Sequence, residues 1–168
     1  MANLSTSKIH IPRWSELPNI DLYMDQVLNY MEEAIPEIIQ TDFEEPYITK
    51  TMINNYVKQE IIASPTKKKY NRLHIAELIV ITFLKQVYSI GDIQKLIQLA
   101  LSTSPADIAY NRFCDVLEES FVSTFSGEEY SSPSILTEEQ YLLKNVVQTF
   151  VNKLYVQLNY LKKDNGIS

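Results

Sequence analysis

The chain has 168 residues, of which 45% are hydrophobic, and it carries a formal net charge of −6. This length and composition allow a sizeable core and exclude a wholly disordered chain. One cysteine excludes an intramolecular disulfide, and two distant histidines with only three glycines leave no pattern for a protein-bound zinc ion or a glycine-rich phosphate loop. We therefore expect no metal site, no cofactor and no enzyme activity.

No segment reads as a membrane span or a secretion signal. The longest apolar stretch, Ile75 to Leu84, is too short to cross a bilayer and contains Glu77. The first ten residues lack the hydrophobic region of a signal peptide. We expect a cytoplasmic protein without a membrane partner.

Long apolar periodicities and few alternating runs predict an all-α fold with room for one small hairpin. Residues 1–17 read as an arm. A first helix is expected to begin near Asn19 or Asp21 and to run to Ala34, before Pro36 ends it. The acidic stretch 37–47 that follows is predicted to be a linker or an irregular turn.

The next predicted helix spans about 49–59, with Thr49 as its N-cap. Its apolar positions fall on one side at helical spacing: Met52, Ile53, Tyr56 and Val57. The opposite side is polar and consists of Lys50, Thr51, Asn54, Asn55 and Lys58. One face is thus expected to pack and the other to meet solvent or a ligand.

A short basic loop follows, because Pro65 breaks the helical pattern ahead of Lys67, Lys68 and Lys69. This loop could form a small hairpin. The stretch 72–87 is apolar on nearly all sides apart from Glu77 and a polar end, so we expect a central, mostly buried helix there.

Three further helices are predicted in the second half of the chain. Ser89 caps the first, the run Ser104-Pro105 starts the second, which reaches about Phe125, and Thr137 caps a last helix of about 25 residues. The last helix carries an apolar seam for packing on its neighbour or on a second chain: Leu143, Val147, Phe150, Leu154 and Leu161.

Aromatic residues of the last two helices have two interpretations. They could line a pocket for a small-molecule effector, although core packing explains their spacing better and no effector is otherwise indicated. They are Tyr110, Phe113, Phe121, Phe125, Tyr141, Phe150 and Tyr155.

Positive charge is concentrated in one window of this acidic chain. Residues 46–74 contain six basic residues and one acidic residue, a formal charge of +5, so the rest of the chain carries −11. A polyanion would be attracted to one face and repelled by the others.

Binding of duplex DNA requires cations that hold the phosphates and a rigid element that carries donors and acceptors into the major groove. The helix at 49–59 offers such an element, and the lysine loop offers the cations. The candidate DNA-binding residues are Lys50, Thr51, Asn54, Asn55, Tyr56, Lys58, Lys67, Lys68, Lys69, Tyr70 and Arg72.

The order of these segments resembles the DNA-binding head of the MerR family of winged helix-turn-helix regulators over about 50 of the 168 residues. The resemblance rests on TKTMINNYVKQEII, the basic run KKKYNR, the apolar helix LHIAELIVITFLKQV and YSIGDIQKLI. A closer resemblance, which includes LPNIDLYMDQVLNYME, is to the YkrK-type bacterial proteins of largely unknown function. In place of the glycine that follows the recognition helix in the MerR family, this chain has Glu60.

This resemblance implies a winged helix-turn-helix head at residues 18–102, preceded by the arm at 1–17 and followed by a C-terminal helical region at 103–168 for dimerisation or bundle packing. The function it implies is a bacterial, sequence-specific transcription regulator that binds double-stranded DNA as a homodimer.

The alternatives are a helical protein-interaction module without DNA binding and, more weakly, a hydrolase. A hydrolase lacks an evident site in this sequence. His74 and Cys114 are interpreted as structural residues.

Overall fold

Helix α4 (Arg72–Leu84) is the central element of the structure, which is a computed structural model that describes residues 9–40, 43, 46–128 and 136–162. Nine of its thirteen residues are buried, as expected for a helix that is apolar on nearly all sides. Asn71 caps it by accepting a hydrogen bond from the backbone N–H of His74 at 3.0 Å. The ring of Phe83 lies 5.6 to 6.3 Å from the rings of Phe43, Phe113 and Phe150, so this helix joins both halves of the chain in one core.

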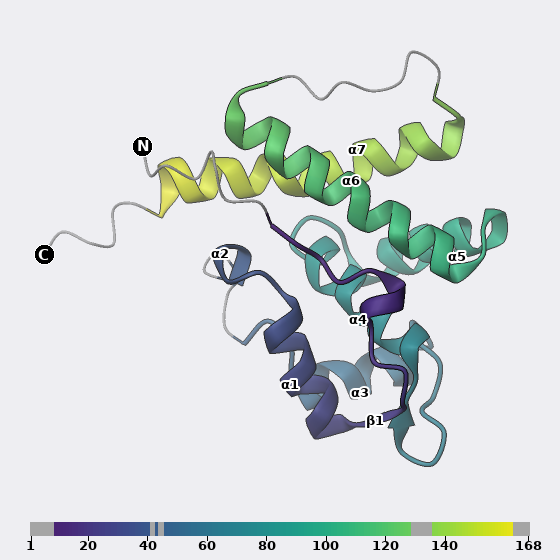
Figure 1. Cartoon of the computed structure of the whole chain (residues 1–168). Helices are drawn as coiled ribbons and strands as arrows, with labels where there is room; N and C mark the ends of the chain where they lie inside the picture. The colour runs from purple at the N-terminus through teal and green to yellow at the C-terminus, as the bar shows by residue number, and fades with distance from the viewer. Residues whose placement is uncertain (1–8, 41–42, 44–45, 129–135, 163–168) are drawn as a thin grey trace, which may run out of the picture.

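The expected helical fold is confirmed (Figure 1). The elements around α4 are, in chain order, a 3-10 turn at Trp14–Glu16, β1 (Leu22–Tyr23), α1 (Met24–Ala34), α2 (Glu37–Gln40), α3 (Lys50–Lys58), β2 (Lys69–Tyr70), α5 (Ile90–Thr103), α6 (Ala106–Ser126), α7 (Glu138–Val156) and a π-turn at Gln157–Leu161.

Helix α1 begins at Met24, several residues later than expected, because the residues before it form a strand. Leu22 and Tyr23 pair antiparallel with Tyr70 and Lys69 of β2. This pairing places the side chain of Leu22 in the core. The predicted end of α1 at Ala34 is confirmed.

The segment predicted as a linker contains the short helix α2, in which Ile39 is fully buried. Gln40 holds this turn against α1, because its side-chain amide donates to the carbonyls of Glu32 and Ile35 at 2.8 and 2.6 Å. Residues 41–42 and 44–45 of the predicted linker lie outside the described part of the chain.

Residues 9–17, which belong to the predicted N-terminal arm, are packed against the rest of the chain. Ile9, Ile11 and Leu17 are buried. Arg13 fastens the segment to α6 through hydrogen bonds to Glu118 at 2.6 and 2.9 Å and to Asp115 at 2.8 and 3.1 Å. Residues 1–8 lie outside the described part of the chain.

The seam of α7 packs against α6 within the same chain (Figure 1). Val147, Phe150 and Leu154 are buried, whereas Leu161 remains 64% exposed. The predicted caps of α5 and α7 are confirmed, since Ser89 and Thr137 accept hydrogen bonds from the backbone N–H groups of Asp92 and Gln140. Parts of the loop between α6 and α7, residues 129–135, and the last residues, 163–168, are not described.

Candidate nucleic-acid interface

Helix α3 presents one polar face to solvent, as its sequence predicts. Lys50, Thr51, Asn54, Asn55 and Lys58 are all exposed. On the other side, Ile53 and Tyr56 are buried and Met52 and Val57 are partly buried. The predicted N-cap is also confirmed, since Thr49 Oγ1 accepts a hydrogen bond from the N–H of Met52 at 3.1 Å.

The lysine loop is a tight hairpin. Thr66 and Lys69 exchange two backbone hydrogen bonds of 3.1 and 3.0 Å, and the two residues between them have positive φ values of 51° and 64°. Two consecutive left-handed residues are typical of a type I′ turn, which suits the twist of a hairpin. Lys67 and Lys68 therefore stand at an exposed tip, and the sequence prediction of a small hairpin is confirmed.

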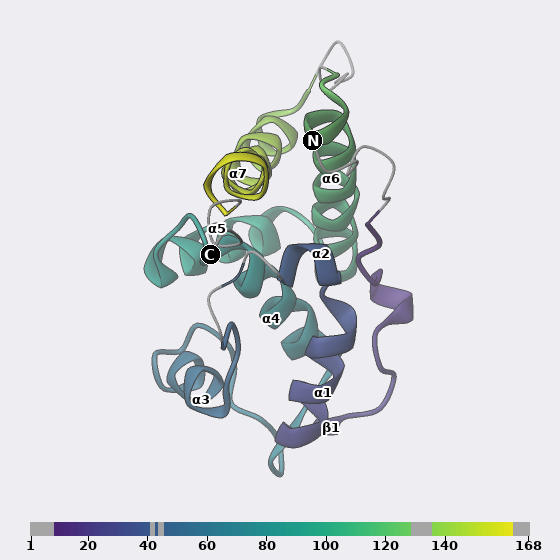
Figure 2. The ribbon, with the colours of Figure 1, turned by 90° about the vertical axis from the view of Figure 1, so that its left-hand side faces the viewer.

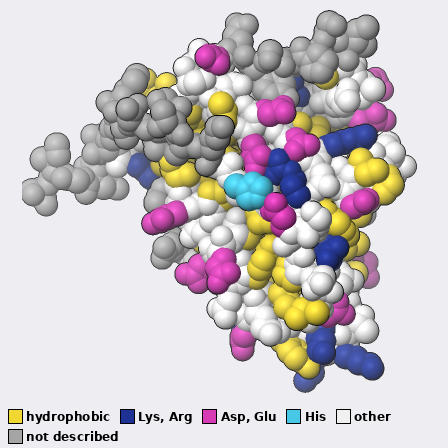
Figure 3. Space-filling model, viewed as in Figure 1, with side chains coloured by type: hydrophobic (Ala, Val, Ile, Leu, Met, Phe, Trp, Pro, Cys, Tyr) yellow, Lys and Arg dark blue, Asp and Glu magenta, His cyan; other side chains and the backbone are white. Residues whose placement is uncertain are grey.

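Helix α3 and this 66–69 hairpin lie at the same end of the molecule, remote from α6 and α7, in both ribbon views (Figures 1 and 2). Lys and Arg side chains gather at the lower tip of the space-filling view, while acidic side chains are scattered over the rest of that face (Figure 3). Positive side chains on this face are therefore concentrated at the end of the molecule that holds α3 and the hairpin.

Three of the candidate basic residues have partners within the chain. The ammonium of Lys50 forms an ion pair with Asp25 at 2.9 Å, and that of Lys69 lies 5.0 Å from the centre of the Tyr23 ring. Arg72 lies 6.0 Å from the Trp14 ring and donates from Nε to the Pro18 carbonyl at 3.4 Å. These four contacts tie α3, β2 and the start of α4 to the N-terminal segment, β1 and α1.

Burial removes two residues from the candidate surface. Tyr56 is 7% exposed and Tyr70 is 3% exposed, because the first belongs to the inner side of α3 and the second pairs with Leu22 in the sheet. Desolvation raises the pKa of both phenols. Both tyrosines, predicted as DNA contacts, thus lie mainly in the core. Lys58, Lys67 and Lys68 form no ion pair with another described residue.

Lys85 anchors α3 and was not recognised as important from the sequence. Its ammonium, at the end of α4, donates to the carbonyl of Tyr47 and to Sδ of Met52 on α3. Burial lowers the pKa of this lysine. The sequence does contain a signal for this role, because Lys85 directly follows a mostly apolar helix. Its ammonium group requires a polar partner once that helix is buried.

His74 and Cys114 have structural environments, as expected. His74 accepts at Nδ1 from the N–H of Asn71 at 2.9 Å, and its Nε2 lies 2.9 Å from the Ala63 carbonyl, so the geometry favours a neutral ring with the proton on Nε2. Cys114 is fully buried, and desolvation raises the pKa of its thiol to about 12.

Neither a metal centre nor a membrane span is present in the described residues. No three His, Cys, Asp or Glu side chains among them lie together in a way that could hold a metal ion. No helix formed by them is both long and apolar enough to cross a bilayer.

Comparison with protein-family models gives a match over residues 12–113 to a domain of unknown function, DUF1836. The matched region begins in the packed N-terminal segment, contains the whole candidate interface and ends within α6. Comparison with curated proteins and with solved structures gives no match.

This match corrects the resemblance to the MerR family and to the YkrK-type proteins. The residues on which the resemblance was based have local structural roles that are common where helices begin and end. Ile61 and Ile62 are buried after α3, and Ser89 caps α5. Such signals define where helices begin and end, and they are too general to identify a family.

Proposed function

The chain belongs to the DUF1836 family, a domain of unknown function, and we propose that it is a sequence-specific transcription regulator that binds double-stranded DNA through α3 and the 66–69 hairpin. The observation that carries this proposal is that an exposed polar helix face and an exposed lysine turn lie at the same end of the molecule, within the positively charged window of an acidic chain.

The dimensions of α3 suit a major groove. A helix with its side chains is about 10–12 Å in diameter and the major groove is about 12 Å wide, so the nine residues of α3 fit within it. Asn54 and Asn55 carry the paired donor and acceptor that fit the edge of adenine, and Lys58 carries donors for guanine or a flanking phosphate. The structure leaves all three side chains exposed.

In this proposal the hairpin acts as the wing of a winged helix-turn-helix head, and α3 is its recognition helix. Lys67 and Lys68 contact phosphates, so they contribute affinity that does not depend on base sequence. Lys50, Lys69 and Arg72 have partners within the chain and mainly hold the two elements in place. The expected cytoplasmic location is part of the same proposal.

We also propose that two copies bind together, because readers of this type usually recognise two half-sites. The seam of α7 is already covered by α6, so a dimer requires another surface. The π-helical segment that follows α7 offers apolar side chains for one, since Tyr160 is 60% exposed and Leu161 is 64% exposed. Sedimentation of the chain with and without DNA tests this part, and a strict one-to-one complex with a single half-site would contradict it.

Selection of bound duplexes from a random pool, followed by mobility-shift assays, tests the main proposal. We expect an enriched sequence that binds more tightly than random DNA. Replacing Asn54 and Asn55 with alanine should cost about 1–3 kcal/mol on the enriched duplex and much less on random duplexes, because only base contacts are lost.

Asn145→Ala provides a matched control, because Asn145 is an exposed asparagine on α7, at the opposite end of the molecule. The absence of any enriched sequence would contradict the proposal and favour the protein-interaction module. Equal losses on enriched and random duplexes would contradict the role of α3.

A further inference from the structure

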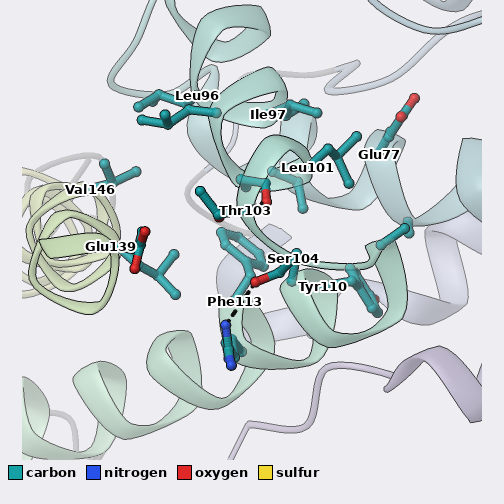
Figure 4. A pocket seen from close by; sticks show the side chains of 18 of the residues that line it. Glu77, Leu96, Ile97, Leu101, Thr103, Ser104, Tyr110, Phe113, Glu139 and Val146 are labelled. Carbon is teal, nitrogen blue, oxygen red and sulfur yellow. Dashed lines mark hydrogen bonds between the residues drawn. The ribbon is translucent and has the colours of Figure 1, made fainter. Parts of the chain in front are cut away.

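A pocket lies between α4, α5, α6 and the beginning of α7, away from the candidate interface (Figure 4). Its volume is about 150 Å³, and most of its lining is apolar, including Val80, Leu84, Leu96, Ile97, Phe113 and Leu143. Apolar cavities of about this volume can hold a single benzene ring. The space therefore suits a small organic molecule better than a protein segment.

The rim of the pocket leaves apolar surface in contact with water. Leu99, Leu101 and Leu142 are exposed, although they belong to the lining. Helix α5 contributes to this exposure, because only Ile93 of its fourteen residues is buried. Covering such surface is favourable by about 25 cal/mol per Å², so an apolar ligand would gain affinity here.

The lining of the pocket contains two acidic residues and one basic residue. Glu77 comes from α4, Glu139 from α7 and Arg112 from α6, whereas α5 contributes no titratable side chain. Arg112 already donates to Ser104 Oγ at 3.0 Å, and the hydroxyl of Tyr110, the remaining titratable group, donates to the Pro12 carbonyl at 2.6 Å. Figure 4 shows Glu77 and Glu139 at opposite ends of the pocket.

Glu77 is the distinctive residue of this site. Its carboxylate is partly buried and forms no hydrogen bond or ion pair with another described residue. Desolvation raises the pKa of Glu77 to about 7. A carboxylate in this position is stabilised when a cation approaches it, because the cation restores the electrostatic interaction that burial removed.

We propose that this pocket binds a small organic cation, with an apolar ring or branched chain between α4, α5 and α7 and an ammonium group at the carboxylate of Glu77. The inference does not depend on DNA binding, and the two can fail separately. If the chain also regulates transcription, this ligand class would be its effector.

Three probes with similar apolar bodies and different charge test the proposal: phenethylamine, phenethyl alcohol and phenylpropionate. Binding is followed by titration of the methyl NMR signals of Val80, Leu96 and Leu143. At about pH 8 we expect the amine to bind roughly 10-fold more tightly than the alcohol, and the carboxylate to bind most weakly. The affinity of the amine should fall at about pH 6, where Glu77 is protonated while the amine keeps its charge.

The variant Glu77→Gln should reduce the affinity of the amine to that of the alcohol and leave the alcohol unchanged. Glu128→Gln, an exposed acid at the end of α6, is the control and should change neither affinity. Equal affinities for amine and alcohol, shifts at methyl groups outside the pocket, or no saturable binding of any probe would overturn the proposal. The pH comparison uses the unaltered chain, so it decides the question even if a variant folds poorly.

Discussion

Glu60 holds a backbone conformation that suits glycine. Its φ is 57°, and it follows α3 at the position where the chain leaves the helix. The N–H groups of Glu60 and Ile61 donate to the carbonyls of Val57 and Tyr56 at 3.0 and 2.9 Å, the pattern of a Schellman motif. Left-handed conformations cost about 1–2 kcal/mol for residues with a Cβ atom, so this end of α3 is strained.

Replacing Glu60 with glycine should stabilise the protein by about 0.5–1 kcal/mol, because the relief of strain exceeds the added flexibility of the unfolded chain. The free energy of unfolding in urea measures this change. Gln59→Gly is the control: the neighbouring residue has an ordinary φ of −86°, so glycine there should give no gain. A loss of stability in Glu60→Gly would contradict the interpretation.

Glu77 makes the stability of the fold depend on pH. Burial raises its pKa from 4.5 to about 7, so folding favours the protonated form. The charged carboxylate therefore destabilises the fold increasingly as the pH rises from 4.5 to 7, and the destabilisation is absent below that range.

We expect Glu77→Gln to stabilise the protein by about 1–2 kcal/mol at about pH 8, after allowance for partial solvent exposure, and by almost nothing at about pH 4. Unfolding in urea at the two pH values measures the difference. Equal effects at both values would show that the carboxylate is well solvated.

At the scale of elements, α3 depends on a few long-range contacts. Its inner side chains reach the core, and Lys85 of α4 holds both the segment before α3 and Met52 within it. The side chain of Gln94 on α5 donates to the carbonyl of Glu60 at 3.0 Å and secures the other end. Contacts from the end of α4 and from α5 therefore hold both ends of α3.

Lys85→Met keeps the apolar stem and removes the donor. We expect the amides of α3 to exchange faster by an amount equivalent to about 1–2 kcal/mol of local stability, with little change in α6 and α7. Hydrogen exchange measures this directly. Lys95→Met, at an exposed lysine of α5, should leave the exchange of α3 unchanged, and unchanged exchange in Lys85→Met itself would remove Lys85 as an anchor.

The N-terminal segment depends on one charged cluster. Desolvation raises the pKa of Glu118, but the hydrogen bonds from Arg13 and from the N–H of Ile11 outweigh it, so the net shift is downward. The cluster thus contributes stability above the ordinary pKa of a glutamate, and this contribution is lost as the pH falls through the lowered value.

Arg13→Ala should destabilise the protein by about 2 kcal/mol, because Glu118 is left partly buried without its cation. Limited proteolysis should then cut residues 9–17 earlier than any other described segment. Arg112→Ala is the control. Arg112 lies on α6, as Glu118 does, and its replacement removes a single hydrogen bond, so it should cost less than about 1 kcal/mol of stability. Equal resistance to protease in both variants would contradict the role of Arg13.

Local patterns predicted the helices well, because they act within a few residues. The inner side of α3 and the cap at Thr49 follow from spacing alone. The strand pair could not be found in this way, since Leu22 and Tyr70 meet across 48 positions and each strand has only two residues. The packing of residues 9–17 was missed for the same reason, because Arg13 finds its acids more than 100 positions away.

The candidate interface was predicted in part. The exposure of Asn54, Asn55 and Lys58 follows from the helical period, and the lysine turn follows from its local composition. Lys69 and Arg72 contact the aromatic rings of Tyr23 and Trp14, which lie more than 40 positions earlier in the chain. Local sequence patterns do not predict such contacts. Basic composition therefore overestimated the number of cations available to a ligand.

At the scale of the whole molecule, positive charge is concentrated in one window of an acidic chain. The window that contains α3 and the hairpin has a formal charge of +5, and the rest of the chain carries −11. A duplex is expected to approach from the hairpin end, since the acidic remainder repels it. The affinity of such a complex falls with salt, with a slope of about −0.9 for each phosphate contacted.

The salt dependence of duplex binding tests the central claim most directly. We expect Lys67→Gln and Lys68→Gln each to reduce the slope of log affinity against log salt by about 1, while Lys153→Gln, on α7 at the opposite end, leaves it unchanged. Both kinds of variant remove one positive charge, so a general effect of net charge would act on them alike. If all three variants show the same slope as the unaltered chain, the hairpin does not contact phosphate, and the proposed interface is wrong.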